Sequence, residues 1–297
     1  TVVGDEAGTA LTTGDNNVAV GFEALKTEDG HGQNVAVGYR ALKTLNAGGD
    51  AHNTAVGNLA GEDVTTGTGN TLIGSLSGMG LTTGGSNTAL GYNSLEVDTA
   101  GSKTVAIGFN ALQAQNFSSA TDSHNTAVGY NSGLVVTTGT NNTLIGGLAG
   151  DALTDADNNV ALGHLSLTTD TKGSRNTALG YATLQTQNFT SATNSNNTAV
   201  GYAAGSALTT AQENTLIGSR AGISITDSND NVAVGYRALE NETRGSRNTA
   251  IGHDALGTQN NTSSTAIYNT AVGHTAGTSI TTGISNNIIG GVAGDAL

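Results

Sequence analysis

Acidic and histidine side chains in turns are the residues whose types could hold a metal ion. Acidic turns include those with Asp155 and Asp157 and with Asp227 and Asp230. Carboxylate oxygens are ligands that Ca²⁺ accepts, but the equivalent turn at 81–86, "LTTGGS", has none. The histidines in turns are His31, His52 and His124, and they form no metal-ligand spacing. We expect no cofactor and no metal, with Ca²⁺ at the acidic turns as the alternative.

Catalytic motifs combine particular residue types at characteristic spacings. The chain has no nucleophile elbow, no phosphate-binding loop and no paired carboxylate in a repeated context. Retaining glycosidases need two carboxylates about 5 Å apart, and neighbouring coils of a repeat fold could supply them. We expect no enzyme and no catalytic residue, and a polysaccharide-degrading tailspike remains an alternative.

Four longer segments, at about 39–52, 110–124, 182–196 and 254–268, interrupt an otherwise regular sequence. The motif Gln-Asn-Phe-Ser/Thr in two of them presents Phe117 and Phe189. Loops on a rigid scaffold often carry recognition residues, so these rings are candidate ligand contacts, or else anchors of the loop. Possible glycosylation sites of the form Asn-x-Ser/Thr are Asn116, Asn188 and Asn261.

The elements that position these residues follow from a repeated phrase, Asn-Thr-Ala-Val-Gly. Its closing glycine, which we call the marker glycine, recurs 17 times at spacings of 17, lengthened to 19 or 21 at every fourth unit. The fourth residue after it reads two Leu and then two Gly after the first unit, which defines a block of 72 residues. Such order predicts one continuous solenoid over 1–297, cut in the middle of a repeat at both ends.

Seventeen residues hold short strands and turns rather than two helices, so we expect an all-β, parallel β-solenoid. The phrase is predicted to be a five-residue strand. The residue before the marker glycine is always aliphatic, as in Val128 and Ile145, and its neighbour, such as Ala127, is also apolar. Because alternate strand residues face opposite sides, both faces need burial, and an identical chain is the simplest partner for the second face.

An asparagine opens the phrase in 15 of 16 complete coils, with Thr104 the exception. Stacked Asn side chains can bond to the coils above and below, so we interpret the column as a structural ladder. Its members are Asn17, Asn34, Asn53, Asn70, Asn87, Asn125, Asn142, Asn159, Asn176, Asn197, Asn214, Asn231, Asn248, Asn269 and Asn286.

Aromatic residues and histidines often follow the marker glycine, as in Tyr130, Tyr181 and His253. A row of rings could stack on sugars, or the rings could pack on one another and on the Leu column. The formal charge of −13 argues against nucleic acid as a partner, and no apolar run is long enough to span a membrane.

The phrases "NTAIG", "NVAVG" and "NTALG" resemble the head domains of trimeric autotransporter adhesins, and also the NTAVGYxAL-type repeats of phage tail-fibre proteins. The resemblance covers all 17 coils. It implies a left-handed β-roll formed by three chains, although the coil here is longer and carries its own four-coil block.

These observations predict a structural and adhesive segment of an extracellular fibre, at a cell surface or on a virion. The expected partners are two further copies of the chain and a cell-surface glycan or protein. An ice-binding solenoid is a further alternative, because Thr often follows the ladder Asn, as in Thr54 and Thr126.

Overall fold

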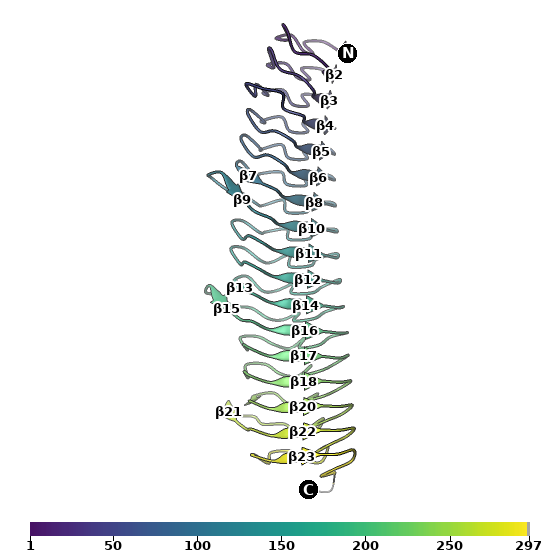
Figure 1. Ribbon diagram of the computed structural model, residues 1–297, viewed down its shortest axis with the longest axis vertical. Coiled ribbons are helices and arrows are strands. Elements are labelled where there is room, and N and C mark those ends of the chain that lie inside the picture. The colour runs from purple at the N-terminus through teal and green to yellow at the C-terminus, as the bar shows by residue number, and fades with distance from the viewer. Residues whose placement is uncertain (296–297) are drawn as a thin grey trace. The chain divides into compact units, whose positions relative to one another are not determined.

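The computed structural model describes residues 1–295 as an all-β chain of stacked coils, which confirms the predicted parallel β-solenoid (Figure 1). Its contacts divide into two compact units, Thr1–Gly147 and Leu148–Leu297, which we describe one at a time. A single domain over 1–297 therefore stays a prediction. Within 1–295 no helix is long and apolar enough to cross a membrane.

In the first unit, one parallel ladder holds a strand from every coil, and a side pair stands apart from it (Figure 1). The ladder strands are β1 (Val2–Val3), β2 (Val18–Val20), β3 (Val35–Val37), β4 (Thr54–Val56), β5 (Thr71–Ile73), β6 (Thr88–Leu90), β8 (Val105–Ile107), β10 (Thr126–Val128) and β11 (Thr143–Ile145). The side pair is β7 (Gly101–Ser102) with β9 (Thr121–Asp122).

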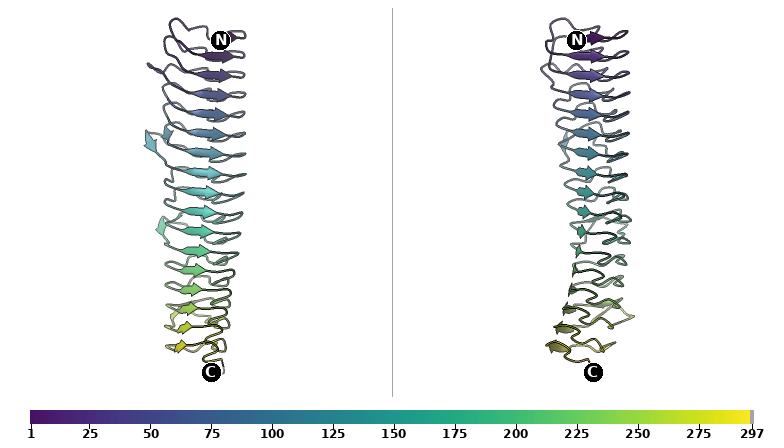
Figure 2. Two further views of the ribbon diagram at one scale, coloured as in Figure 1. Left: turned by 45° about the vertical axis from the view of Figure 1, so that its right-hand side comes forward. Right: turned by 90° about the vertical axis from the view of Figure 1, so that its right-hand side faces the viewer.

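The second unit repeats this plan with two side pairs. Its ladder strands are β12 (Val160–Leu162), β14 (Thr177–Leu179), β16 (Thr198–Val200), β17 (Thr215–Ile217), β18 (Val232–Val234), β20 (Thr249–Ile251), β22 (Thr270–Val272) and β23 (Asn287–Ile289). The side pairs are β13 (Gly173–Ser174) with β15 (Thr193–Asn194) and β19 (Gly245–Ser246) with β21 (Thr265–Ala266). Figure 2 shows the ladder strands of each unit from two further sides.

The ladder is in register by column. Ala127 pairs with Leu144 and Val128 with Ile145, so each residue meets its equivalent in the next coil. The ladder strands from β2 to β23 are three residues long, not five as the sequence predicted, because the marker glycine turns the chain. Gly38, for example, has a φ of +140°, and a Cβ there would lie 2.1 Å from the carbonyl oxygen of Gly57. Only glycine allows the coils to stack this closely at the turn.

The interior of each coil is narrow. The middle residue of each ladder strand from β2 to β22, usually Ala, is fully buried, and so is the Leu that comes four residues after the marker glycine, such as Leu42 and Leu112. A small residue one position before this Leu is buried as well, as in Ala41 and Ala111. The interior of these coils is therefore tightly filled by small residues and Leu.

The alternation of two Leu and two Gly follows from packing inside the coil. Leu72, at the middle of β5, replaces the usual Ala, and a Cβ on Gly61 or Gly78 would lie 2.7 or 2.6 Å from its methyl carbons. One large side chain in the strand thus fills the space that two glycines leave open. In the second unit Leu216 takes the same place against Gly205 and Gly222.

Candidate functional site

The outward face of the ladder carries an uncharged aliphatic column. The first and third residues of the strands point outward, and the third is Val, Ile or Leu throughout. Val128 and Ile145 are only half-buried in the single chain, and Leu162 and Ile217 expose 44% and 39% of their surfaces. The interior column is therefore Ala or Leu at the strand middle, and the residue before the marker glycine faces outward. Each main-ladder strand in the described part of the chain lacks a charged residue.

A ring column lies beside the aliphatic column, just past the marker glycine. Tyr92, Phe109 and Tyr130 stack with ring centroids 5.4 and 5.6 Å apart. In the second unit His164, Tyr181 and Tyr202 stack in the same way, and His253 stacks on His274 with Tyr236 tilted against it at 35°. The histidines therefore take the place of aromatic rings, as one reading of the sequence expected.

The rings do not pack on the Leu column, which lies inside the coil, and the Phe and Tyr rings expose between 37% and 58% of their surfaces. Every fourth coil replaces the ring with a small residue, as at Ser75 and Ser219. The ring column is thus a set of short stacks separated by gaps, and both it and the aliphatic column are open to solvent in a single chain.

Ion pairs lie close to the rings at two places. In the first unit Glu23 accepts hydrogen bonds from Lys26 Nζ at 2.6 Å and Arg40 Nε at 2.7 Å, and Lys43 Nζ lies 3.3 Å away. The hydrogen bond from Lys26 and these neighbouring cations lower the pKa of Glu23 to about 2. In the second unit Glu240 contacts both Arg220 and Arg237.

The Asn column lies inside the solenoid and links successive coils. The backbone N–H of Asn70 donates to Oδ1 of Asn53 at 2.8 Å, and Nδ2 of Asn70 donates to the carbonyl of Gly84 at 2.9 Å. Side-chain oxygens accept in the same way along Asn159, Asn176, Asn197, Asn214, Asn231, Asn248, Asn269 and Asn286. Asn286 is half-buried and the other ladder residues are buried. At Thr104 the backbone still donates to Asn87.

The insert at 110–124 is held by a buried carboxylate that the sequence analysis missed. Asp98 Oδ1 accepts the N–H groups of Gly101 and Phe117 at 3.0 and 3.1 Å, and its Oδ2 accepts Nε2 of Gln115 at 2.6 Å. Oε1 of Gln115 accepts in turn from the ladder residue Asn125 at 2.8 Å. Burial raises the pKa of Asp98. The network joins the insert to the Asn ladder.

Phe117 and Phe189 are buried, with 6% and 5% of their surfaces exposed. The insert at 182–196 repeats the network through Asp170 and Gln187, at the same distances of 3.0, 3.1 and 2.6 Å. This burial favours the anchoring role over ligand contact. Asp98, Gln115, Asp170 and Gln187 each lie seven residues after a marker glycine. This common position in the repeat is the sequence feature from which the network could have been predicted.

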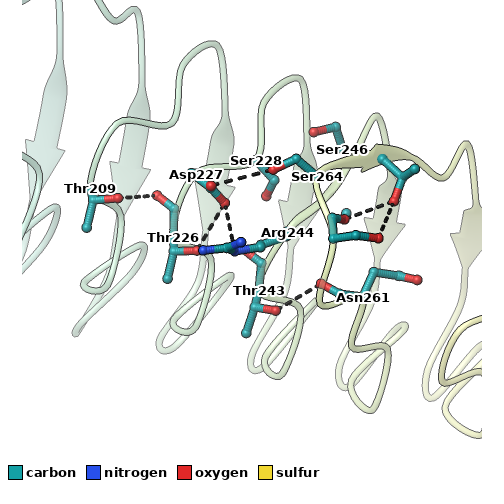
Figure 3. A network of polar contacts seen from close by, with 12 residues as sticks. Thr209, Thr226, Asp227, Ser228, Thr243, Arg244, Ser246, Asn261 and Ser264 are labelled. Atoms are coloured by element: carbon teal, nitrogen blue, oxygen red, sulfur yellow. Dashed lines mark hydrogen bonds and ion pairs between the residues drawn. The ribbon is translucent and has the colours of Figure 1, made fainter.

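The insert at 254–268 is held by a glutamate in place of the aspartate of the other two inserts, and its buried apolar side chain is an isoleucine in place of the phenylalanine. Glu242 accepts N–H groups from Gly245 and Asn261 at 2.7 and 3.1 Å, and Gln259 Nε2 donates to it at 2.6 Å. Asn261 stands where the other inserts have Phe, while Ile267 is buried against Gly245. Figure 3 shows the edge of this insert, where Thr243 donates to the backbone oxygen of Asn261 at 2.9 Å.

The three predicted glycosylation sites differ in access. Asn116 and Asn188 are exposed, and each accepts a hydrogen bond from a Thr hydroxyl of the preceding coil at 3.1 Å. Asn261 is buried, and its Nδ2 donates to Glu242 at 2.9 Å. The position equivalent to Asn116 is Asn260, which accepts from Thr243 and also begins an Asn-x-Thr sequence.

The acidic turns are paired with basic side chains. Asp155 lies 3.4 Å from Lys172, and Asp230 lies 3.3 Å from Arg247. Asp227 lies 3.5 Å from Arg244, as Figure 3 shows. The one group of three or more acidic and histidine side chains within metal-binding distance in residues 1–295 is elsewhere, at Glu28, Asp29 and His31.

His31 is thus brought into a cluster that its position in a turn did not indicate, while His52 and His124 are exposed. No family model, curated protein or solved structure matches the chain. The function must therefore be inferred from the surfaces of the molecule itself.

Proposed function

We propose that this chain is a structural and adhesive segment of an extracellular fibre, of the kind found in phage tail fibres and bacterial surface adhesins. The observation that supports it best is the outward aliphatic column, which every ladder strand continues without a charged residue. In this proposal the fibre contains three copies of the chain, each a left-handed β-roll, as the resemblance to adhesin heads implies.

The outward column is the proposed contact between copies. Parallel sheets are covered on both faces in stable proteins, and contiguous exposed apolar surface marks an interaction site. A second copy is the fitting occupant because its own column repeats with the same coil spacing, so identical chains match coil by coil. A stable interface buries about 800 Å² on each partner, and a column repeated in every coil supplies area without one large anchor.

The inserts are the proposed display elements. Phe117 and Phe189 are buried, so the residues that face solvent are the polar ones that follow them, Ser118, Ser119, Thr190 and Ser191. Hydroxyl-bearing loops held on a rigid scaffold suit the recognition of a glycan or protein surface. No catalytic role is part of this proposal.

Lysines placed on the aliphatic column test the proposal. We expect the double substitution Ile217→Lys with Ile251→Lys to convert the trimer to monomers, because each contact would bring like charges into an apolar interface. The matched control, Thr210→Lys with Thr281→Lys, adds the same charge at exposed turn positions and should leave the trimer intact. Sedimentation velocity measures both, and an unchanged mass in the first variant would rule out this face as the contact.

A further inference from the structure

A turn between β2 and β3 gathers one imidazole and two carboxylates. His31 Nδ1 lies 3.3 Å from Glu28 Oε1 and 3.9 Å from Asp29 Oδ1. One ligand atom from each of the three residues lies within 4.8 Å of the other two. The Glu28 side chain is fully buried, His31 is partly buried, and Asp29 reaches solvent.

Glu28 has equivalents in the other three blocks. It stands seven residues after its marker glycine, as do Asp98, Asp170 and Glu242. In each of those three blocks the second carboxylate oxygen accepts Nε2 of a glutamine in the next coil at 2.6 Å. The first oxygen accepts the N–H of a glycine three residues on, at 3.0, 3.0 and 2.7 Å.

The first block has changed both partners. Leu45 occupies the position of the glutamine, and His31 occupies the position of the glycine. The N–H of His31 still donates to Glu28 Oε1 at 3.1 Å. Within residues 1–295, however, neither Glu28 Oε2 nor His31 Nδ1 has a hydrogen-bond partner, although both atoms are buried. Two orphaned polar atoms in one cluster are costly unless a ligand satisfies them.

We propose that Glu28, Asp29 and His31 bind a divalent transition-metal ion of the Zn²⁺ type. Imidazole nitrogen and carboxylate oxygen are both ligands of such ions, at about 2.0–2.2 Å. Two ligands at that range on a tetrahedral ion stand about 3.3 Å apart, which matches the distance from His31 Nδ1 to Glu28 Oε1. Asp29, being exposed, can rotate to become the third ligand, and water completes the shell.

The chemistry of the set distinguishes this ion from Ca²⁺. Calcium takes six to eight oxygen ligands, and a cluster with an imidazole and two carboxylates offers too few. Transition metals accept imidazole readily. All three ligands come from the turn at 28–31, and the N–H of Gly32, just after them, donates to Asp50 in the first insert at 2.9 Å. The proposed role is therefore to fix the turn that precedes β3.

Zinc titration of the metal-free full-length chain, followed by isothermal calorimetry, tests the site. The chain should bind one more Zn²⁺ than His31→Gly does, and its unfolding temperature should rise with Zn²⁺ but not with Ca²⁺. Glycine is the residue in the other three blocks, so His31→Gly should fold.

The control variant is His124→Ala, which removes an exposed turn histidine and should bind Zn²⁺ as the parent chain does. Equal stoichiometry and affinity in the parent chain and in His31→Gly would overturn the proposal. Loss of stability in His31→Gly with no change in Zn²⁺ binding would also overturn it, because the cluster would then be only a histidine–carboxylate ion pair.

Discussion

Individual residues hold this chain together by contacts that cross from coil to coil. The ladder asparagines satisfy both a backbone N–H and a backbone carbonyl of neighbouring coils, as Asn70 does with Asn53 and Gly84. Glu23 also links neighbouring coils, at the surface, because its ion partners Lys26, Arg40 and Lys43 come from two coils. The chain has no Trp, no Cys and few aromatic residues, so bonds between coils contribute stability that a large hydrophobic core provides in other proteins.

The stabilisation from Glu23 should depend on pH. Its folded pKa of about 2 lies below the unfolded value of 4.5, so the contribution is present above about pH 4.5 and is lost as the pH falls through 2. We expect Glu23→Gln to lower the unfolding temperature near pH 7 and to make little difference near pH 2. Glu213→Gln, at an exposed turn, is the control and should have little effect at either pH. A Glu23→Gln deficit that did not shrink in acid would contradict the assignment.

At the scale of the element, each coil is one strand with its turns, and its interior is shared with its neighbours. The sequence predicted the coil, the parallel stacking and the positions of the inserts, because all three follow from the period and from apolar alternation. It did not predict why Leu and Gly alternate in pairs. That pattern depends on Leu72 filling the space beside Gly61 and Gly78, a contact between residues of two neighbouring coils.

This packing predicts a compensating pair of substitutions. Gly61→Leu alone should destabilise the chain by about 1–3 kcal/mol, because the new side chain collides with Leu72. Leu72→Ala alone should cost about 2–5 kcal/mol through the cavity that it leaves. The double variant should recover part of both losses, since Leu in the same position and backbone conformation is already present at Leu42. Chemical denaturation measures the coupling, and strictly additive losses would contradict the packing.

The roles of the candidate site residues could not be predicted from the sequence alone. Phe117 and Phe189 were candidates for ligand contact or for anchoring, and the deciding contacts come from Asp98 and Asp170, nearly 20 residues earlier. The sequence did not predict a metal site at His31. The nearby carboxylate of Glu28 lacks its usual glutamine partner, and this becomes evident only when the coils are aligned and Leu45 is found in the position of that glutamine. Both cases involve pairs that the fold brings together across coils, which spacing along the chain does not display.

In the whole molecule, we propose that other copies of the chain cover the outward aliphatic column. In the single chain this column and the stacked rings beside it are open to solvent, although each strand is uncharged. The strand pattern indicated that both faces of each strand are apolar. It could not predict which column faces outward, because Ala and Val both suit a buried position.

Sedimentation equilibrium on the unmodified chain measures whether the copies assemble. The chain has a mass of 29.4 kDa, and the trimer predicted here would have three times that mass at micromolar concentration. Dilution into the low nanomolar range should not dissociate an interface that recurs in every coil. A single species of 29.4 kDa that stays folded and soluble would contradict the account, because the outward column would then be stable in water without a partner.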